Sequence, residues 1–278
     1  MRLRLLVLAF LVSALAPSAP AQNSTYETGL DLRSAFAAQV DRRFEIPEEE
    51  ARRYAVLLAN ALEKAKLLSL RSQFIVLVDR NPYVQAAMIY WRSPLGNFYL
   101  IGASPASTGL PGSYEHFETP LGVFDHAIAN PDYRAEGTLN ELGIRGLGRE
   151  GMRVYDFGWQ IAKRGWGPGG ESPMRLLIHA TDPQWLEEKL GRAMSKGCIR
   201  IPAAFDEFID RYGILDADYE RAASEGKRFW VLRSDREPTP WSGRYLVIVD
   251  SERTARPEWV RPPSRRRGAA GIKELACR

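Results

Sequence analysis

A small set of residues in the second half of the chain has the types and spacing needed for thiol chemistry. A thiol becomes a strong nucleophile only as the thiolate, so Cys198 would need a base or a positive field nearby. His179, which precedes it in the chain, would supply an imidazole base, and Lys196 and Arg200 would favour negative charge on the sulfur. Gly197 would let backbone amides approach the oxyanion of a tetrahedral intermediate. These residues predict a cysteine nucleophile paired with a histidine base, with a buried cysteine or a disulfide as the alternatives.

The sequence has two cysteines, Cys198 and Cys277. In an exported protein, two cysteines commonly form one disulfide bond. The glycine and the basic residues beside Cys198 favour a reactive thiol instead, and Cys277, next to the C-terminus, is expected to be a free thiol. A disulfide between the two is the alternative interpretation.

The other histidines, His116 and His126, are expected to have ordinary surface or packing roles, with substrate contact as the alternative. The sequence contains no His-x-x-x-His pair and no closely spaced cysteine pair, so no metal site is predicted. No organic cofactor is expected either, because a thiol supplies covalent chemistry by itself.

Short apolar runs bounded by turn residues predict the strands that would carry these groups. The expected strands are 74–78, 84–91, 98–103, 121–125, 174–178, 227–233 and 244–249. The first three would form an antiparallel meander. His179 would lie at the end of the buried strand 174–178.

Helices are predicted in three places. Apolar residues at three- and four-residue steps indicate a helix over 47–70, which Pro47 and three glutamates begin. Helices are also expected at 182–191 and between Pro202 and Gly213. Residues 130–170 are glycine-rich and are predicted to form a long functional loop or lid. Its aromatic residues are expected to pack rather than to bind substrate: Tyr155, Phe157, Trp159 and Trp166.

The first 21 residues are typical of a secretory signal peptide. Residues 1–4 are basic, 5–15 are apolar, and 16–21 are small residues that end in an Ala-x-Ala pattern. The apolar run is too short to span a bilayer comfortably, although an uncleaved anchor is the alternative. The protein is therefore expected to be exported, to the periplasm of a Gram-negative bacterium.

The composition describes an ordinary globular chain, with 45% hydrophobic and 26% charged residues. It excludes a disordered chain and a bundle of membrane helices. The net charge of +4 is spread along the sequence rather than gathered in one patch, so no nucleic-acid partner is predicted.

The segment around Cys198 resembles the signature of the YkuD-type L,D-transpeptidases, in which a histidine precedes a Ser/Thr-x-Gly-Cys block by about this interval. Residues 119–124, Thr-Pro-Leu-Gly-Val-Phe, resemble the second recurrent patch of that family. The two patches occur in the family's order, which is more specific than either alone. The resemblance covers residues 73 to about 233. It implies a β-rich α+β fold, with a YkuD-like β-sandwich catalytic domain and an N-terminal helical segment.

The chain is accordingly expected to divide into four parts. These are a signal peptide (1–21), a linker and helical segment (22–72), the catalytic domain (73–235), and a strand with a Pro/Arg-rich tail (236–278).

The resemblance also implies residue roles. Cys198 would be the nucleophile, His179 the general base, and Gly197 with the amide of Cys198 the oxyanion hole. Ser195 would brace the loop, and Arg200 would order the site or bind a substrate carboxylate. Substrate contact is further expected for the positions Thr119, Gly122 and Lys196.

Two departures from the family pattern concern the neighbours of these groups. Lys196 stands where a second histidine is often found, and Ala180 stands where glycine or serine is frequent. A backbone carbonyl is therefore expected to orient His179.

The implied reaction is acyl transfer on peptidoglycan peptide stems. The Cys198 thiolate would attack the diaminopimelate carbonyl of a tetrapeptide, release D-alanine and pass the acyl group to an amine. That amine would belong to another stem or to an outer-membrane protein. The alternatives are a hydrolase of the same stems that uses the same cysteine, and a non-catalytic wall-binding protein. The long segment 130–170 favours transfer, which must exclude water.

Overall fold

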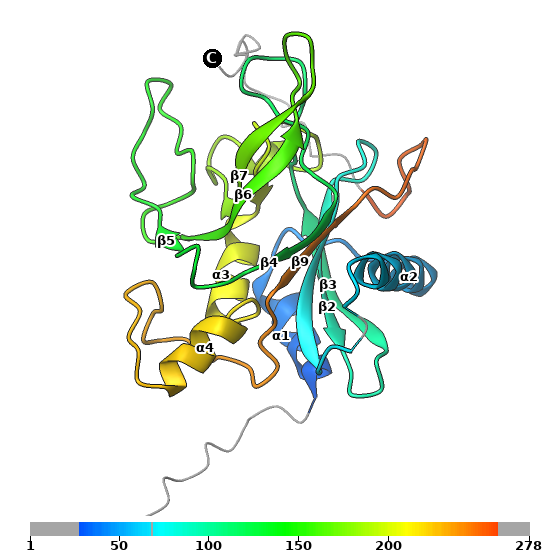
Figure 1. Cartoon of the computed structure of the whole chain (residues 1–278), viewed down its shortest axis with the longest axis vertical. Coiled ribbons are helices and arrows are strands. Elements are labelled where there is room, and N and C mark those ends of the chain that lie inside the picture. Colours follow the sequence, from blue (N-terminus) through cyan, green and yellow to red (C-terminus); the bar gives the residue numbers. More distant parts are fainter. Residues whose placement is uncertain (1–27, 68, 261–278) are drawn as a thin grey trace, which may run out of the picture.

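The computed structural model describes residues 28–67 and 69–260, which form two β-sheets with helices packed around them (Figure 1). The predicted β-rich α+β fold is confirmed. The predicted signal peptide and Cys277 lie outside the described residues. Within those two ranges, no helix has the length and apolar character required to cross a membrane.

The elements follow one another in this order: η1 (Gly29–Asp31), α1 (Leu32–Gln39), α2 (Glu48–Lys64), β1 (Gln73–Asp79), β2 (Ala86–Arg92), β3 (Phe98–Pro105), β4 (Gly122–Asp125), β5 (Tyr133–Arg134), β6 (Arg153–Lys163), β7 (Glu171–Ala180), η2 (Glu187–Lys189), β8 (Ile199–Ile201), α3 (Ala203–Tyr212), α4 (Ala217–Ser224) and β9 (Tyr245–Val249).

The first sheet, sheet A, has the strand order β3-β2-β1-β9-β4. The predicted meander of β1, β2 and β3 is confirmed, since both pairs are antiparallel. β9 lies parallel to β1, with Ile75 opposite Tyr245, and β4 pairs antiparallel with the far side of β9. A strand from near the end of the chain is therefore the neighbour of the first strand.

The second sheet, sheet B, has the order β5-β6-β7-β8. β6 and β7 form a long antiparallel hairpin whose tip extends beyond sheet A in Figure 1. β8 is short and pairs parallel with the end of β7, where Ile178 is opposite Ile199 and His179 is opposite Arg200. This pairing brings the two predicted catalytic segments together.

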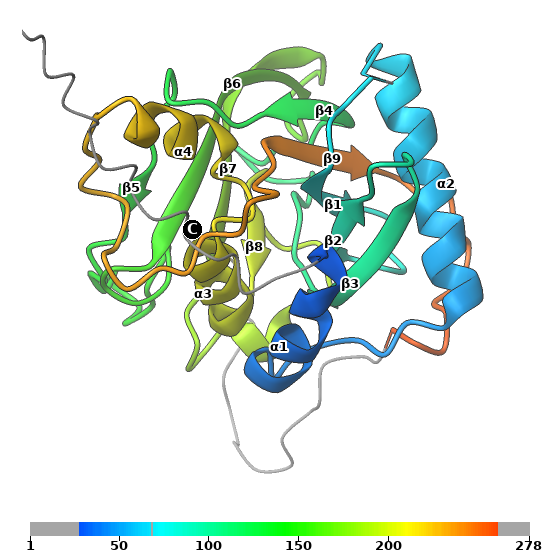
Figure 2. The ribbon, with the colours of Figure 1, turned by 90° about the horizontal axis from the view of Figure 1, so that it is seen from below.

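The main core lies between the two sheets and is closed at one end by α1 and α3 (Figure 2). Met174, Leu176 and Ile178 of β7 point into it and are nearly or fully buried. Because successive residues of a strand point to opposite faces, the alternate residues of β7 point away from sheet A. That side of sheet B is the outer face, and it carries Arg175 and His179.

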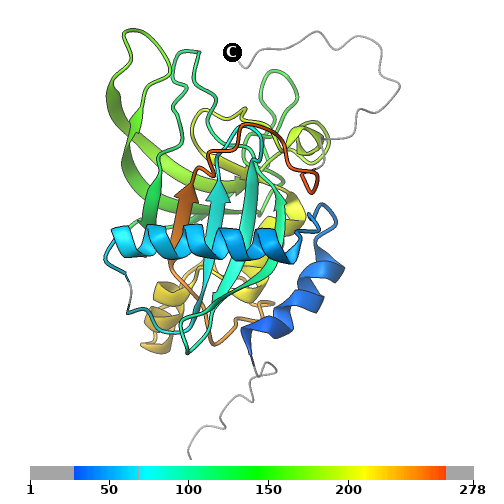
Figure 3. The same cartoon turned by 90° about the vertical axis from the view of Figure 1, so that its right-hand side faces the viewer.

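Helix α2 lies across the other face of sheet A (Figure 3). Tyr54, Leu58 and Leu62 are buried against the sheet, and burial of each such side chain contributes about 1.5–3 kcal/mol. The hydroxyl of Tyr54 donates a 2.7 Å hydrogen bond to Asp79 at the end of β1. The helix begins after Pro47, as predicted, but ends at Lys64 rather than near residue 70.

Helix α3 follows the prediction closely. Pro202 precedes its first turn, and Gly213 ends it in the left-handed conformation (φ +58°), which glycine adopts without steric cost.

Three predicted elements are wrong. Residues 227–233 are irregular with one short turn rather than a strand, and the helical part of 182–191 is the short 3₁₀ helix η2. The stretch 130–170 is not one long loop, because it contains the whole of β6. The connecting loop is shorter and comprises residues 135–152, between β5 and β6; this loop is called the lid.

Candidate active site

The parallel pairing of β7 and β8 places His179 and Cys198 close together at the edge of sheet B. His179 is opposite Arg200, and Cys198 lies two residues before Arg200, directly ahead of β8. His179 and Cys198 are therefore diagonal neighbours across the two segments, an arrangement in which larger side chains can meet. Cys198 packs against the apolar cluster on the outer face, which includes Leu177.

The Cys198 thiol is a free thiol that lies against the backbone of β7. Its Sγ donates to the carbonyl of Arg175 at 3.6 Å. Burial raises the pKa of the thiol, whereas a hydrogen bond from the backbone of Leu177 and the charge of Arg200 lower it by less. The free protein therefore holds Cys198 as a neutral thiol at neutral pH.

The His179 ring is only 4% exposed and is oriented by its neighbour's main chain. Nδ1 lies 2.7 Å from the carbonyl oxygen of Ala180. Because a carbonyl only accepts, Nδ1 carries the proton and Nε2 is left as the basic nitrogen. A backbone carbonyl orients the ring, as the sequence predicted.

The His179 imidazole is neutral in the free protein. Its pKa is lowered to about 4, chiefly by burial; the hydrogen bond to Ala180 opposes the shift and the charge of Arg200 adds to it. A neutral imidazole has a free nitrogen that can accept a proton, but a pKa of about 4 makes His179 a weak base in this unliganded conformation.

Ser195 and Thr119 brace the loop that carries the thiol. Ser195 Oγ donates to the carbonyl of Cys198 and accepts from the amide of Gly197 at 3.0 Å. Thr119 Oγ1 donates to the carbonyl of Gly197 at 2.7 Å and accepts from the amide of Gly109 at 2.8 Å. Thr119 is 1% exposed, so its hydroxyl supports the loop from the buried side.

Gly197 has a backbone conformation (φ +135°) that residues with a side chain rarely adopt. A Cβ atom at this position would lie 2.8 Å from Met174 Sδ and 3.2 Å from Phe117 Cβ. The loop can therefore approach β7 this closely only because position 197 has no side chain.

The two basic residues of the segment have different surroundings. Lys196 is half-exposed, and its Nζ lies 3.2 Å from a carboxylate oxygen of Glu115. Arg200 is opposite His179 in the sheet, and its charge lowers the pKa of both His179 and Cys198. Arg200 therefore acts electrostatically on both members of the pair.

Three other residues singled out in the sequence lie in different surroundings. Gly122 begins β4 and pairs with Ile248 in sheet A. His126 is fully buried, with Nε2 2.8 Å from Asp132. His116 is 7% exposed, and its Nδ1 lies 3.1 Å from the carbonyl of Leu110. Both histidines have the packing role that the sequence favoured.

The aromatic residues of 130–170 fall into two groups. Tyr155 and Phe157 are buried in the main core, and Trp166 packs edge-on against Phe117 with ring centroids 4.8 Å apart. Packing is confirmed for these residues. Trp159, in contrast, is 68% exposed on the outer face, where it pairs with Arg175.

The structure adds three residues near the thiol that were not singled out in the sequence: Tyr133, Asp156 and Arg175. Arg175 Nε donates to Asp156 at 2.7 Å, and Asp156 is fully buried. Tyr133 packs against the same outer-face apolar cluster as Cys198, and burial raises the pKa of its hydroxyl. The sequence held one indication of Arg175. Arg175 lies between Met174 and Leu176, whose apolar side chains are expected to face the core, so the Arg175 side chain is expected on the other face of the strand.

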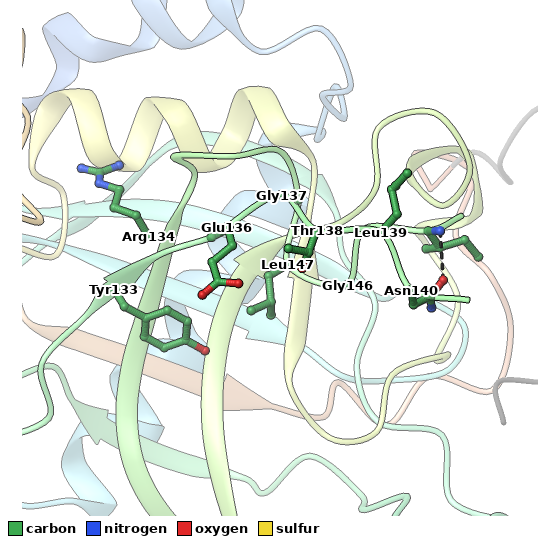
Figure 4. Close-up of a pocket in the computed structure, with 12 residues that line it drawn as sticks. Tyr133, Arg134, Glu136, Gly137, Thr138, Leu139, Asn140, Gly146 and Leu147 are labelled. Carbon is green, nitrogen blue, oxygen red and sulfur yellow. Dashed lines mark hydrogen bonds between the residues drawn. The ribbon is translucent and has the colours of Figure 1, made fainter. Parts of the chain in front are cut away.

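The lid covers the His179 end of the outer face. Within the lid, the amide of Gly151 donates to the carbonyl of Ala135. The amide of Arg145 donates to Asp182 Oδ2 at 2.8 Å. Gly148 comes so close to Ala180 that a Cβ would lie 2.8 Å from it. A cavity of about 360 Å³ lies along the lid between Tyr133 and Gly148 (Figure 4).

The comparisons with known proteins do not identify a family, since no family model matches the sequence and no curated protein is significantly similar to it. In the part of the chain that the structure describes, no three histidine, cysteine or carboxylate side chains gather closely enough to hold a metal ion.

Proposed function

We propose that this chain is an exported cysteine acyltransferase of the YkuD L,D-transpeptidase type that acts on the peptide stems of peptidoglycan. One observation carries the proposal. The β7–β8 pairing brings His179 and Cys198 to diagonal positions at one sheet edge, beside a glycine-permitted loop and the charge of Arg200. The motif resemblance at these same residues supports the choice of family. Two packed sheets suit the proposed YkuD-like sandwich.

In the acylation step, the Cys198 sulfur attacks the diaminopimelate carbonyl of the stem while Nε2 of His179 takes the thiol proton. Nε2 of His179 has no proton in the resting form, and because the pKa of His179 is low and that of Cys198 is raised, the proton moves as the sulfur bonds to the carbonyl and not before. The C–N bond to the terminal D-alanine then breaks. The proton on His179 passes to the departing amine, and a thioester remains on Cys198.

In the second step, an acceptor amine attacks the thioester. One proton of the amine passes to His179 Nε2 and then to the sulfur as the C–S bond breaks. The products are a new amide and the free thiol, so the enzyme returns to its starting state.

The negative oxygen of both tetrahedral intermediates needs hydrogen-bond donors. The amide of Gly197 already donates to Ser195 Oγ, so we assign the amide of Cys198 as the donor from this loop. The role of Ser195 is then to hold the loop in the conformation that presents that amide.

The proposal has two rivals. With water as acceptor, the same site would hydrolyse stems. In the other rival, a wall-binding protein would use no chemistry and would join Cys198 to Cys277 in a disulfide.

A turnover experiment separates these possibilities. The mature chain is incubated with a disaccharide-tetrapeptide from peptidoglycan, and the products are analysed by liquid chromatography and mass spectrometry. We expect release of D-alanine and formation of a 3→3 cross-linked dimer by the wild type and by Cys277→Ser, and neither product with Cys198→Ser. Tripeptide without dimer would support the hydrolase, and unchanged substrate would contradict the enzyme proposal.

A further inference from the structure

The cavity along the lid is large enough to take part of a substrate. Its volume of about 360 Å³ lies within the range usual for ligand sites, roughly 300–1,000 Å³. It is lined by residues 133–140, 144 and 146–148, which belong to β5 and the lid.

This cavity borders the proposed catalytic pair. Tyr133 and Leu147 line it and pack, together with Cys198, against the same apolar cluster on the outer face. Gly148 lines it as well and comes close to Ala180, the residue after His179. The lid therefore covers the His179 end of the site, whereas Arg175, on the other side of the thiol along β7, has a side chain that is 45% exposed.

The chemistry gives the site a direction. His179 must give its proton to the leaving nitrogen and must later take one from the attacking nitrogen, so both nitrogens lie on the His179 side of the thioester carbon. The acyl part of the substrate then extends the other way, toward Arg175. The cavity at the His179 end is placed to hold the group that bears the leaving nitrogen and afterwards the group that bears the attacking nitrogen.

The charges along the cavity suit an amine. Among the described residues that line it, Glu136 is the only carboxylate and Arg134 the only cation. The Arg134 guanidinium is turned away to Asp210, with Nη1 2.6 Å from Oδ2. Figure 4 shows the Glu136 carboxylate and the Tyr133 ring projecting on the other side of the chain from Arg134. No ion pair joins Glu136 to another residue of the described part of the chain.

We infer that the cavity is the acceptor subsite and that Glu136 binds the ammonium group of the acceptor, so that the enzyme favours an amine over water. This inference rests on the proposed function. The bound ammonium loses one proton to solvent, and the neutral amine attacks the thioester. The second proton passes through His179 Nε2 to the sulfur, as in the general scheme.

The test measures how the acyl-enzyme is divided between acceptors. The full mature chain is supplied with a synthetic stem tetrapeptide as donor and with either an Nα-acetyl-lysine amide or hydroxylamine as acceptor. At pH 7 the lysine side chain is an ammonium and hydroxylamine is mostly neutral. The variant is Glu136→Gln, and the matched control is Glu141→Gln, an exposed lid glutamate that does not line the cavity.

For Glu136→Gln we expect the KM of the lysine acceptor to rise about two- to fivefold, the size of effect that the loss of one solvent-exposed charge contact gives. The rate of acyl-enzyme formation should not fall, because Glu136 gives no favourable contact to the carboxylate of the leaving D-alanine, and the use of hydroxylamine should stay within about twofold of the wild type. Glu141→Gln should behave as the wild type does.

Two outcomes would overturn the inference. One is an equal response of Glu136→Gln and Glu141→Gln to the lysine acceptor. The other is an equal loss of both acceptors in Glu136→Gln, which would point to a distorted lid. Failure of the wild type to form any acyl-enzyme would instead overturn the proposed function, and the inference with it.

Discussion

Thr119 is hydrogen-bonded to Gly197, so the residue that precedes β4 by a few positions supports the loop that carries the thiol. Its hydroxyl donates to the Gly197 carbonyl at 2.7 Å and accepts from the Gly109 amide at 2.8 Å. The hydroxyl therefore joins three segments that are separate in the sequence. It connects the two sequence patches that resemble the transpeptidase family.

Replacing Thr119 by valine keeps the shape but removes both hydrogen bonds. We expect the free energy of unfolding to fall by about 1–3 kcal/mol, because a buried amide and a buried carbonyl lose their partner. Acylation of Cys198 should slow as well, since the loop loses its support. Denaturant unfolding and acylation kinetics measure the two effects. Thr119→Ser keeps the hydroxyl and should retain most of both, and a Thr119→Val protein with unchanged acylation would refute the bracing role.

Replacing Gly197 by alanine should abolish most activity in a folded protein. The positive φ costs about 1–2 kcal/mol with a side chain present, and the new Cβ would lie 2.8 Å from Met174 Sδ. A displacement of the loop by about 1 Å would slow acylation about 100-fold.

Gly226→Ala is the control for this substitution, because Gly226 also has a positive φ (+90°) but has open space around its Cα. It should lose a similar amount of stability and no activity. Equal activity losses in the two variants would show that backbone strain, and not the approach to β7, limits position 197.

The pH dependence of alkylation tests the neutral resting state. Burial raises the pKa of Cys198, and the pKa of His179 is lowered to about 4. Because neither group is charged between pH 5 and 8, the rate of carboxamidomethylation of Cys198 by iodoacetamide should rise steadily through this range and beyond the usual thiol pKa of about 8.5. A rate that is high and constant from pH 5 to 8 would contradict the neutral state and indicate a preformed thiolate–imidazolium pair.

The buried charges around Arg153 stabilise the fold without taking part in the chemistry. Arg153 is fully buried and contacts Asp132, Asp210 and Asp216 at 2.6–3.2 Å. Arg153→Met should lower the free energy of unfolding by about 3 kcal/mol, the lower end for a broken buried ion pair, because each of the three carboxylates keeps a second partner: His126, Arg134 and Arg236.

The control for Arg153→Met is Arg149→Met, which breaks the exposed ion pair with Glu207 and should cost no more than about 1 kcal/mol. Urea unfolding measures both changes. The alkylation rate of Cys198 per folded molecule should be the same in both variants, and a slower rate in Arg153→Met would place these charges in the site's electrostatics.

The local elements of the fold could be predicted because their patterns are local. Helix α3 has a proline before it and a glycine after it, and β1 to β3 are consecutive strands with turns between them. The position of β9 beside β1 could not be predicted, since the pairing joins segments far apart in the chain and leaves no local trace.

The wrong predictions have separate physical causes. Gly158 made β6 resemble a loop, but it lies at the irregularity between Asp156 and Trp159 that the sheet accommodates. At 182–191, Asp182 Oδ1 accepts from the amides of Gln184 and Trp185, which produces a turn that does not continue as an α-helix.

The predicted strand at 227–233 is wrong for a different reason. Its apolar residues do not join a sheet, and Trp230 is 74% exposed.

For the site, the sequence indicated the proposed reacting groups better than their surroundings. Cys198 and His179 were proposed from residue type and order together with the family resemblance. Tyr133, Asp156 and Glu136 became visible only once the strands were paired and the lid was placed, because no spacing in the sequence relates them to the thiol.

The most direct test of the central claim, that Cys198 is an activated acyl acceptor, is the intact mass of the chain without its predicted signal peptide after incubation with a carbapenem. The strained lactam carbonyl of this drug would be opened by the same attack that we propose for the stem. We predict a single adduct with the mass of the drug on the wild type and on Cys277→Ser, and no adduct on folded Cys198→Ala. A folded wild type with a free Cys198 thiol and no adduct would contradict the account.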